Sequence, residues 1–129
     1  MKENKITKKI LVIEDEHFIG ELYTRALSRA GYEVKVVADG QEALKEAQTN
    51  QYDIILLDLM IPNLNGMDVL NILKDTTKTP ELNAKIIVTT NLEQRDEVRE
   101  DIENKADAYL IKAELTPMQL VEFLNNIKV

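Results

Sequence analysis

The sequence contains no cysteine, so neither a disulfide framework nor a zinc site built on thiolates is possible. Basic residues are also few: 16 lysines and arginines stand against 23 aspartates and glutamates, for a net charge of −7. This mean field would repel the phosphates of a nucleic acid, which argues against a nucleic-acid partner. No apolar stretch approaches the roughly 20 residues needed to cross a bilayer, so we expect no membrane contact and a cytoplasmic protein.

The phosphate-binding loops of nucleotide enzymes are missing too, because neither GxGxxG nor GxxxxGKS/T occurs. The 129 residues suffice for one domain with a sizeable core, and no linker or repeat interrupts them. Four lysines cluster before the first apolar run, at Lys2, Lys5, Lys8 and Lys9. We therefore predict a basic, solvated tail over residues 1–9 and a single domain over residues 10–129.

Short apolar runs alternate with stretches of helical periodicity along the chain. Strands are predicted at Ile10–Ile13, Glu33–Val37, Tyr52–Asp58, Lys85–Thr90 and Ala108–Ile111. Helices are predicted at His17–Ala30, after Asp39, after Gly66, at Leu92–Lys105 and from Pro117 to Ile127. Since each crossover must return over one face of the sheet, and does so right-handedly, this order predicts a doubly wound parallel α/β fold of three layers.

Local signals support several of these helices. Gly31 stands where a left-handed C-cap is wanted, and Asp39 with Glu42 has the spacing of a capping box. Thr116 followed by Pro117 is an N-cap with proline in the first helical position. The 92–105 segment is mostly charged, so we predict a solvated helix that touches the sheet along a thin stripe, with a partner surface as the alternative.

Polar side chains follow most of the predicted strands at the point where each strand ends. Glu14 and Asp15 follow the first strand, Asp58 ends the third, Thr90 ends the fourth and Lys112 follows the fifth. The carboxyl ends of parallel strands share one edge, and ligands of open α/β sheets bind outside that edge. We therefore expect these side chains to form one site.

The chemistry of this cluster can be argued from the residue types. Three carboxylates repel one another unless a cation lies between them, and hard oxygen ligands are what Mg²⁺ prefers. Asp58 is then available as a nucleophile toward phosphorus. The metal, the Lys112 ammonium and the Thr90 hydroxyl could each hold one oxygen of the transferring phosphoryl group. The predicted product is an aspartyl phosphate that water can later cleave.

These residues resemble the receiver domain of bacterial two-component response regulators, of the CheY-like kind. The resemblance covers Ile10 to Val129 and rests on Glu14, Asp15, Asp58, Pro62, Gly66, Thr90, Tyr109 and Lys112. It implies the flavodoxin-like strand order 2-1-3-4-5. It also implies that Asp58 accepts phosphate from a sensor histidine kinase or a phosphotransfer protein, in a reaction that the domain itself catalyses.

The resemblance also implies roles for single residues. Asp15, Asp58 and the backbone carbonyl of Met60 would bind Mg²⁺, with Glu14 assisting. Thr90 and Tyr109 would be the switch pair, which changes the surface of the fourth helix, fifth strand and fifth helix that a downstream effector reads.

Two alternatives and two departures from the family pattern accompany this interpretation. A pseudo-receiver would be an interaction module without phosphorylation, and an aspartate-nucleophile phosphatase would need a second acid where Met60 stands. Ala113 replaces the proline usual after the lysine, which predicts a trans bond there, and Asn91 replaces a usually small residue. His17 is expected on the surface at a helix start, and Met67 and Met118 as core filler.

Overall fold

The computed structural model describes residues 7–75, 77, 82–91 and 96–127. Five parallel strands form one sheet in the order β2-β1-β3-β4-β5. The strands are β1 (Lys9–Ile13), β2 (Glu33–Val37), β3 (Ile54–Asp58), β4 (Lys85–Thr90) and β5 (Ala108–Ile111). The predicted strand order is confirmed, and β2 lies at an edge of the sheet, where its polar composition fits.

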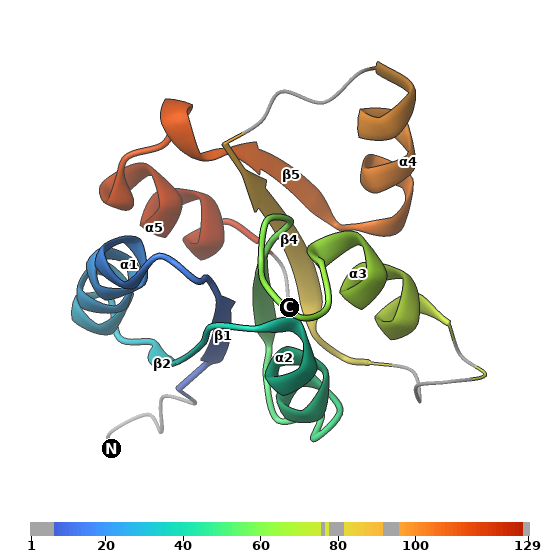
Figure 1. Cartoon of the computed structure of the whole chain (residues 1–129). Coiled ribbons are helices and arrows are strands. Elements are labelled where there is room, and N and C mark those ends of the chain that lie inside the picture. Colours follow the sequence, from blue (N-terminus) through green and yellow to red (C-terminus); the bar gives the residue numbers. More distant parts are fainter. Residues whose placement is uncertain (1–6, 76, 78–81, 92–95, 128–129) are drawn as a thin grey trace.

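Helices cover both faces of this sheet (Figure 1). They are α1 (His17–Arg29), α2 (Gly40–Ala47), α3 (Gly66–Lys74), α4 (Asp96–Lys105) and α5 (Pro117–Asn125), with a 3-10 turn η1 at Lys112–Glu114. Figure 1 shows α1 and α5 on one side of the strands and α2, α3 and α4 on the other. No helix in the described ranges is both long enough and apolar enough to span a membrane.

The central strand β3 shows why the sheet needs cover on both faces. All five of its residues are buried, so it has no solvent side. Ile55 and Leu57 join the core beneath α2, α3 and α4, whereas Ile54 and Leu56 join the core beneath α1 and α5. Alternate side chains thus enter two separate cores, as the two-residue period of a strand requires.

The helix ends follow the local signals in the sequence. The Asp39 carboxylate accepts a hydrogen bond from the backbone N–H of Glu42 at 2.9 Å, which caps α2. Thr116 and Gln119 exchange both hydrogen bonds of a capping box at the start of α5. Gly31 has φ +100°, the left-handed conformation predicted for the end of α1.

Within its described residues, helix α4 has few apolar contacts, as the sequence predicted. It begins at Asp96, and residues 92–95 of the predicted helix lie outside the described ranges, Leu92 among them. Ile102 is completely buried, but Val98 is 40% exposed and contributes little to the core. The apolar stripe that holds this helix to the sheet is therefore very narrow.

Two other predictions about the last third of the chain were wrong. Met118 is 70% exposed and fills no core, because it faces outward from the first turn of α5; Met67, by contrast, packs against the core as predicted. The last helix ends at Asn125, before Ile127, and η1 was not predicted. The backbone after Lys112 is trans, as expected for a bond that precedes alanine.

Gly66 closes the loop that follows β3. Its backbone N–H donates to the carbonyl of Leu59 at 3.0 Å, which folds the loop back toward the end of the strand. A Cβ atom at this position would lie 2.4 Å from the Cα of Leu59 and 2.5 Å from the carbonyl oxygen of Asp58. Only glycine allows the loop to lie this close to Asp58.

We therefore expect Gly66→Ala to destabilise the domain by about 1 to 3 kcal/mol or more, because backbone atoms must move apart. The measurement is urea unfolding. Gly20→Ala in α1 is the control: its Cβ would meet a side chain, Val36, at 3.3 Å, and alanine favours a helix. Equal stability of the two variants would show that the Asp58 loop tolerates the methyl group.

Candidate functional site

The carboxyl ends of β1 and β3 place three carboxylates together, as the sequence predicted. Glu14 and Asp15 directly follow β1, and Asp58 is the last residue of β3. One oxygen from each of the three lies within 4.8 Å of the others. Glu14 and Asp58 are each 3% exposed, whereas Asp15 is on the surface. Asp15 is therefore the carboxylate of this group that is most open to solvent.

Lys112 enters this cluster from the far side of β4. It is the first residue of η1, directly after β5, and only 8% of it is exposed. Its Nζ donates to Asp58 Oδ2 at 2.8 Å and also to Glu14 Oε1. A single ammonium group therefore joins the ends of β1, β3 and β5.

The electrostatics of this cluster follow from its burial. Loss of solvent raises the pKa of Glu14 to about 7, helped by the nearby Asp58 and opposed by Lys112. Burial would lower the pKa of Lys112, but its hydrogen bonds to Asp58 and Glu14 outweigh this and raise it. Lys112 is therefore a permanent cation, while Glu14 changes charge near neutral pH.

A cavity of about 240 Å³ opens beside Asp58. It is lined by Asp15, Glu16, Asp58, Met60, Asn91 and Lys112. The backbone N–H of Met60 donates to Asp58 Oδ1 at 3.0 Å, and the Met60 side chain is 59% exposed at the cavity's mouth.

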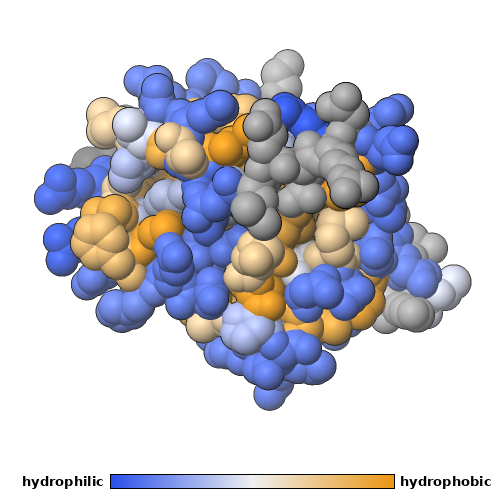
Figure 2. Space-filling model, turned by 45° about the horizontal axis from the view of Figure 1, so that its top comes forward, coloured by the Kyte–Doolittle hydropathy of each residue, from blue (hydrophilic) through white to orange (hydrophobic). Residues whose placement is uncertain are grey.

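Figure 2, in which the top of the molecule in Figure 1 comes forward, shows mostly hydrophilic residues with hydrophobic ones between them.

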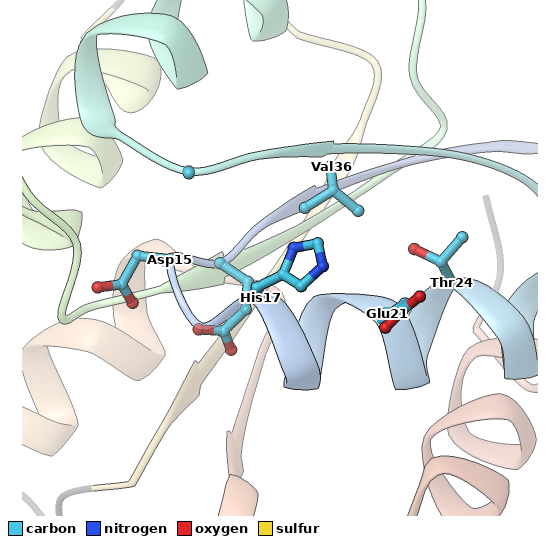
Figure 3. A pocket seen from close by; sticks show the side chains of 7 residues that line it. Asp15, His17, Glu21, Thr24 and Val36 are labelled. Atoms are coloured by element: carbon cyan, nitrogen blue, oxygen red, sulfur yellow. The ribbon is translucent and has the colours of Figure 1, made fainter.

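A second cavity, of about 460 Å³, lies between α1 and β2. Figure 3 shows the His17 imidazole below Val36 of β2, while Asp15 directs its carboxylate the other way. His17 is exposed at the first position of α1, as predicted. It is not among the groups of the acidic cluster.

The predicted switch residues lie on neighbouring strands. Thr90 ends β4 and is completely buried, next to Thr89, which pairs in register with Asp58. Tyr109 lies in β5, half-buried and paired with Val88. The structure positions both residues, and their role as a switch stays a prediction.

Two residues near the site were not singled out from the sequence. Glu16 lines the cavity beside Asp58, and its backbone N–H donates to Glu14 Oε2 at 3.3 Å. Arg99 in α4 lies over the Tyr109 ring, with 4.9 Å between its Cζ atom and the ring centroid. No sequence pattern marked Arg99, because α4 is charged along its whole length.

Comparison with known proteins decides the family. The model of the response regulator receiver domain matches residues 10–125. The chain belongs to this family. Its fold and its assignment as a two-component receiver domain are thus confirmed, and no observation favours the pseudo-receiver alternative.

Individual relatives agree with this assignment. The receiver domain is 34% identical over 120 residues to the response regulator ArlR of Staphylococcus saprophyticus, a match that covers 93% of this chain and 50% of ArlR. It thus spans about half the length of that relative.

Two solved structures have the same fold. The chemotaxis protein CheY4 of Vibrio cholerae is 27% identical with a TM-score of 0.80, over 95% of this chain and 100% of that one. The N-terminal receiver domain of Klebsiella pneumoniae RstA, described as BeF3-activated, is 25% identical with a TM-score of 0.78, over 92% and 96% of the two chains.

The raised pKa of Glu14 predicts how stability depends on pH in this receiver domain. Between the usual value of 4.5 and about 7, the folded state holds a proton on Glu14 that the unfolded state has released. The free energy of unfolding should therefore fall as pH rises through this window, by at most about 3 kcal/mol from this group. In Glu14→Gln the part of this fall that comes from the titration of Glu14 should be absent.

The measurement is urea unfolding in EDTA at pH 5 and pH 8. Glu122→Gln, which changes an exposed glutamate of α5, is the control and should keep the wild-type difference between the two pH values. If the free energy of unfolding of Glu14→Gln fell as much between pH 5 and pH 8 as that of wild type, Glu14 would not be the group that titrates.

Proposed function

We propose that Asp58 of this receiver domain accepts a phosphoryl group from the phosphohistidine of a sensor histidine kinase or a phosphotransfer protein. One observation carries the proposal: Asp58 is buried, its Oδ2 accepts from Lys112 at 2.8 Å, and a cavity of about 240 Å³ opens beside it. An Asp58 oxygen forms the new bond to phosphorus. The phosphorus–nitrogen bond of the donor breaks, and the imidazole nitrogen keeps the electron pair.

The three carboxylates suit a divalent cation, and we assign it as Mg²⁺. Against Glu14, Asp15 and Asp58 when all are ionised, the one ammonium of Lys112 leaves an excess of negative charge. Hard oxygen ligands with room for water are the environment that Mg²⁺ prefers. The Met60 carbonyl would add a fourth ligand. When bound, the metal would offset charge on the transferring group.

Lys112 and Thr90 are the protein groups that would offset the negative charge on the oxygens of the transferring phosphoryl group. The Lys112 ammonium already contacts Asp58, so it needs little movement to reach an oxygen of the arriving group. Thr90, at the end of the next strand, offers a hydroxyl as donor. These two residues would give the reaction partners for two oxygens, and a bound metal would offset charge on the third.

The regulated output is the surface of α4, β5 and α5. A phosphoryl group on Asp58 would draw the Thr90 hydroxyl toward it, and Tyr109 would turn into the space released beside β4. The light anchoring of α4, with Ile102 as its deeply buried residue, suits an element that shifts. A downstream effector that binds the shifted surface better would then be regulated.

This function also bears on how the chain is divided and where it works. We propose residues 10–129 as the receiver domain and residues 1–9 as a basic tail, although β1 already begins at Lys9, the last residue of that stretch. A phosphoryl donor of this class and an acidic, phosphate-repelling surface are consistent with a cytoplasmic protein that binds neither nucleic acid nor membrane through this domain.

Asp58→Asn should abolish phosphorylation, because an amide is not a competent nucleophile in this role. The protein is incubated with acetyl phosphate and Mg²⁺ and then weighed intact. Wild type should gain one phosphoryl group, and should gain none in EDTA. Asp68→Asn, an exposed aspartate of α3, is the control and should behave as wild type. Modification that persists in Asp58→Asn would place the phosphoacceptor elsewhere.

Met60→Asn should shorten the lifetime of the aspartyl phosphate. The exposed Met60 thioether stands at the mouth of the cavity and cannot orient a water molecule, whereas an amide can donate and accept hydrogen bonds. Decay is followed by intact mass after the donor is removed. Met118→Asn, an exposed methionine in α5, is the control. Unchanged or slower decay in Met60→Asn would refute the argument from water orientation.

A further inference from the structure

Helix α4 contacts strand β5 through a cation and an aromatic ring. The Arg99 guanidinium carbon lies 4.9 Å from the centroid of the Tyr109 ring. Cation–π attraction operates within about 6 Å of a ring centroid, so this pair is within its range. Tyr109 is half-buried, and the Arg99 side chain is 41% exposed, so the contact lies at a partly exposed position.

A second contact fixes the guanidinium over the ring. Arg99 Nε donates to Glu103 Oε1 at 2.8 Å, one helical turn further along α4. A charge-assisted hydrogen bond of this length restricts the side chain to few rotamers. The planar guanidinium is therefore restrained by its own helix as well as by Tyr109, which reduces the entropy lost in the stacking.

Two further contacts of α4 with its neighbours are described, and neither of them involves β5 near the start of the helix. Ile102 is its completely buried side chain, and Val98 is 40% exposed. Lys105 Nζ donates to Asn71 Oδ1 of α3 at 2.8 Å, which ties the end of the helix to its neighbour. Arg99 lies nearer the start of α4 and joins it to β5.

We propose that Arg99 is a positioning residue that holds Tyr109 in its resting place and so sets the balance between the resting and switched states. The inference rests on the proposed role of Tyr109 as a switch. Movement of the ring away from its present place breaks the contact with Arg99. Whatever this contact contributes therefore stabilises the resting state, and the phosphoryl group must overcome it.

Loss of the contact should favour the switched state. A cation–π pair at a partly exposed position contributes an amount that corresponds to about a two- to fivefold change in an equilibrium constant. Beryllofluoride, a phosphoryl mimic, binds the switched state preferentially under the proposed function. With Mg²⁺ present, Arg99→Gln should therefore bind beryllofluoride about two- to fivefold more tightly than wild type.

Arg25→Gln is the matched control. Arg25 also pairs with a glutamate one helical turn away, Glu21 of α1 at 3.7 Å, although in the opposite order along the chain, and no aromatic ring lies beneath it among the described residues. Its affinity for beryllofluoride should equal that of wild type. Arg99→Lys keeps a cation above the ring but lacks the planar fork, so its affinity should lie between wild type and Arg99→Gln.

The ring signals of Tyr109 in NMR spectra give a readout that a change in stability alone would not move. Without beryllofluoride, the Tyr109 signals of Arg99→Gln should be displaced from the wild-type positions toward those of the beryllofluoride-saturated protein. Thermal melts confirm that each variant is folded. The role of Arg99 alone would be overturned if Arg99→Gln bound beryllofluoride no more tightly than wild type, while the Tyr109 signals of wild type still changed on binding.

Failure of the underlying function looks different. If wild type did not bind beryllofluoride, or bound it without any change at Tyr109, the switch itself would be absent and the role of Arg99 would fall with it. Asp58→Asn, measured in the same series, identifies binding that does not depend on the proposed site and so separates the two results.

Discussion

The buried contact of Lys112 with Asp58 and Glu14 is the interaction on which the rest of this site depends. Charges that are removed from water need partners, and loss of one partner leaves an uncompensated charge at a cost of several kcal/mol. Here the ammonium comes from β5 and the carboxylates from β1 and β3, so the cluster exists only while the sheet is correctly assembled. With all three carboxylates ionised, the same cluster carries excess negative charge, which is the basis of the cation site proposed here.

The sheet supports this cluster rigidly. Both faces of β3 are packed, so the strand that carries Asp58 cannot slide or rotate without disruption of two cores. Gly66 then brings the following loop back against the strand end, and the Met60 N–H holds one oxygen of Asp58. Under the proposed function, a nucleophile held in this way would need little reorganisation when a phosphoryl group arrives.

Helix α4 has the opposite physical character. Its sequence offers few apolar residues, and polar contacts such as Arg99 with Tyr109 and Lys105 with Asn71 attach it to its neighbours. Such contacts are individually weak at a partly exposed surface, so small free energies at Asp58 can compete with them. A rigid site beside a lightly held helix is the combination that a phosphorylation switch requires.

Much of this protein follows from the sequence alone, because its strongest signals are local. Buried strands, caps at Asp39 and Thr116, and the turn at Gly31 depend on residues a few positions apart. Parallel crossovers then bring the strand ends to one edge, so the meeting of Glu14, Asp15, Asp58 and Lys112 was predictable without their distances.

Only the tertiary structure decided which charged groups of the site form hydrogen bonds with one another, and which side chains of α4 and α5 face the core or the solvent. Lys112 lies 98 residues from Glu14 along the chain, and its choice of both carboxylates depends on the burial of all three groups. The stacking of Arg99 on Tyr109 and the exposure of Met118 depend on how α4 and α5 rotate about their axes. That rotation is set by packing between distant elements, which no local pattern records.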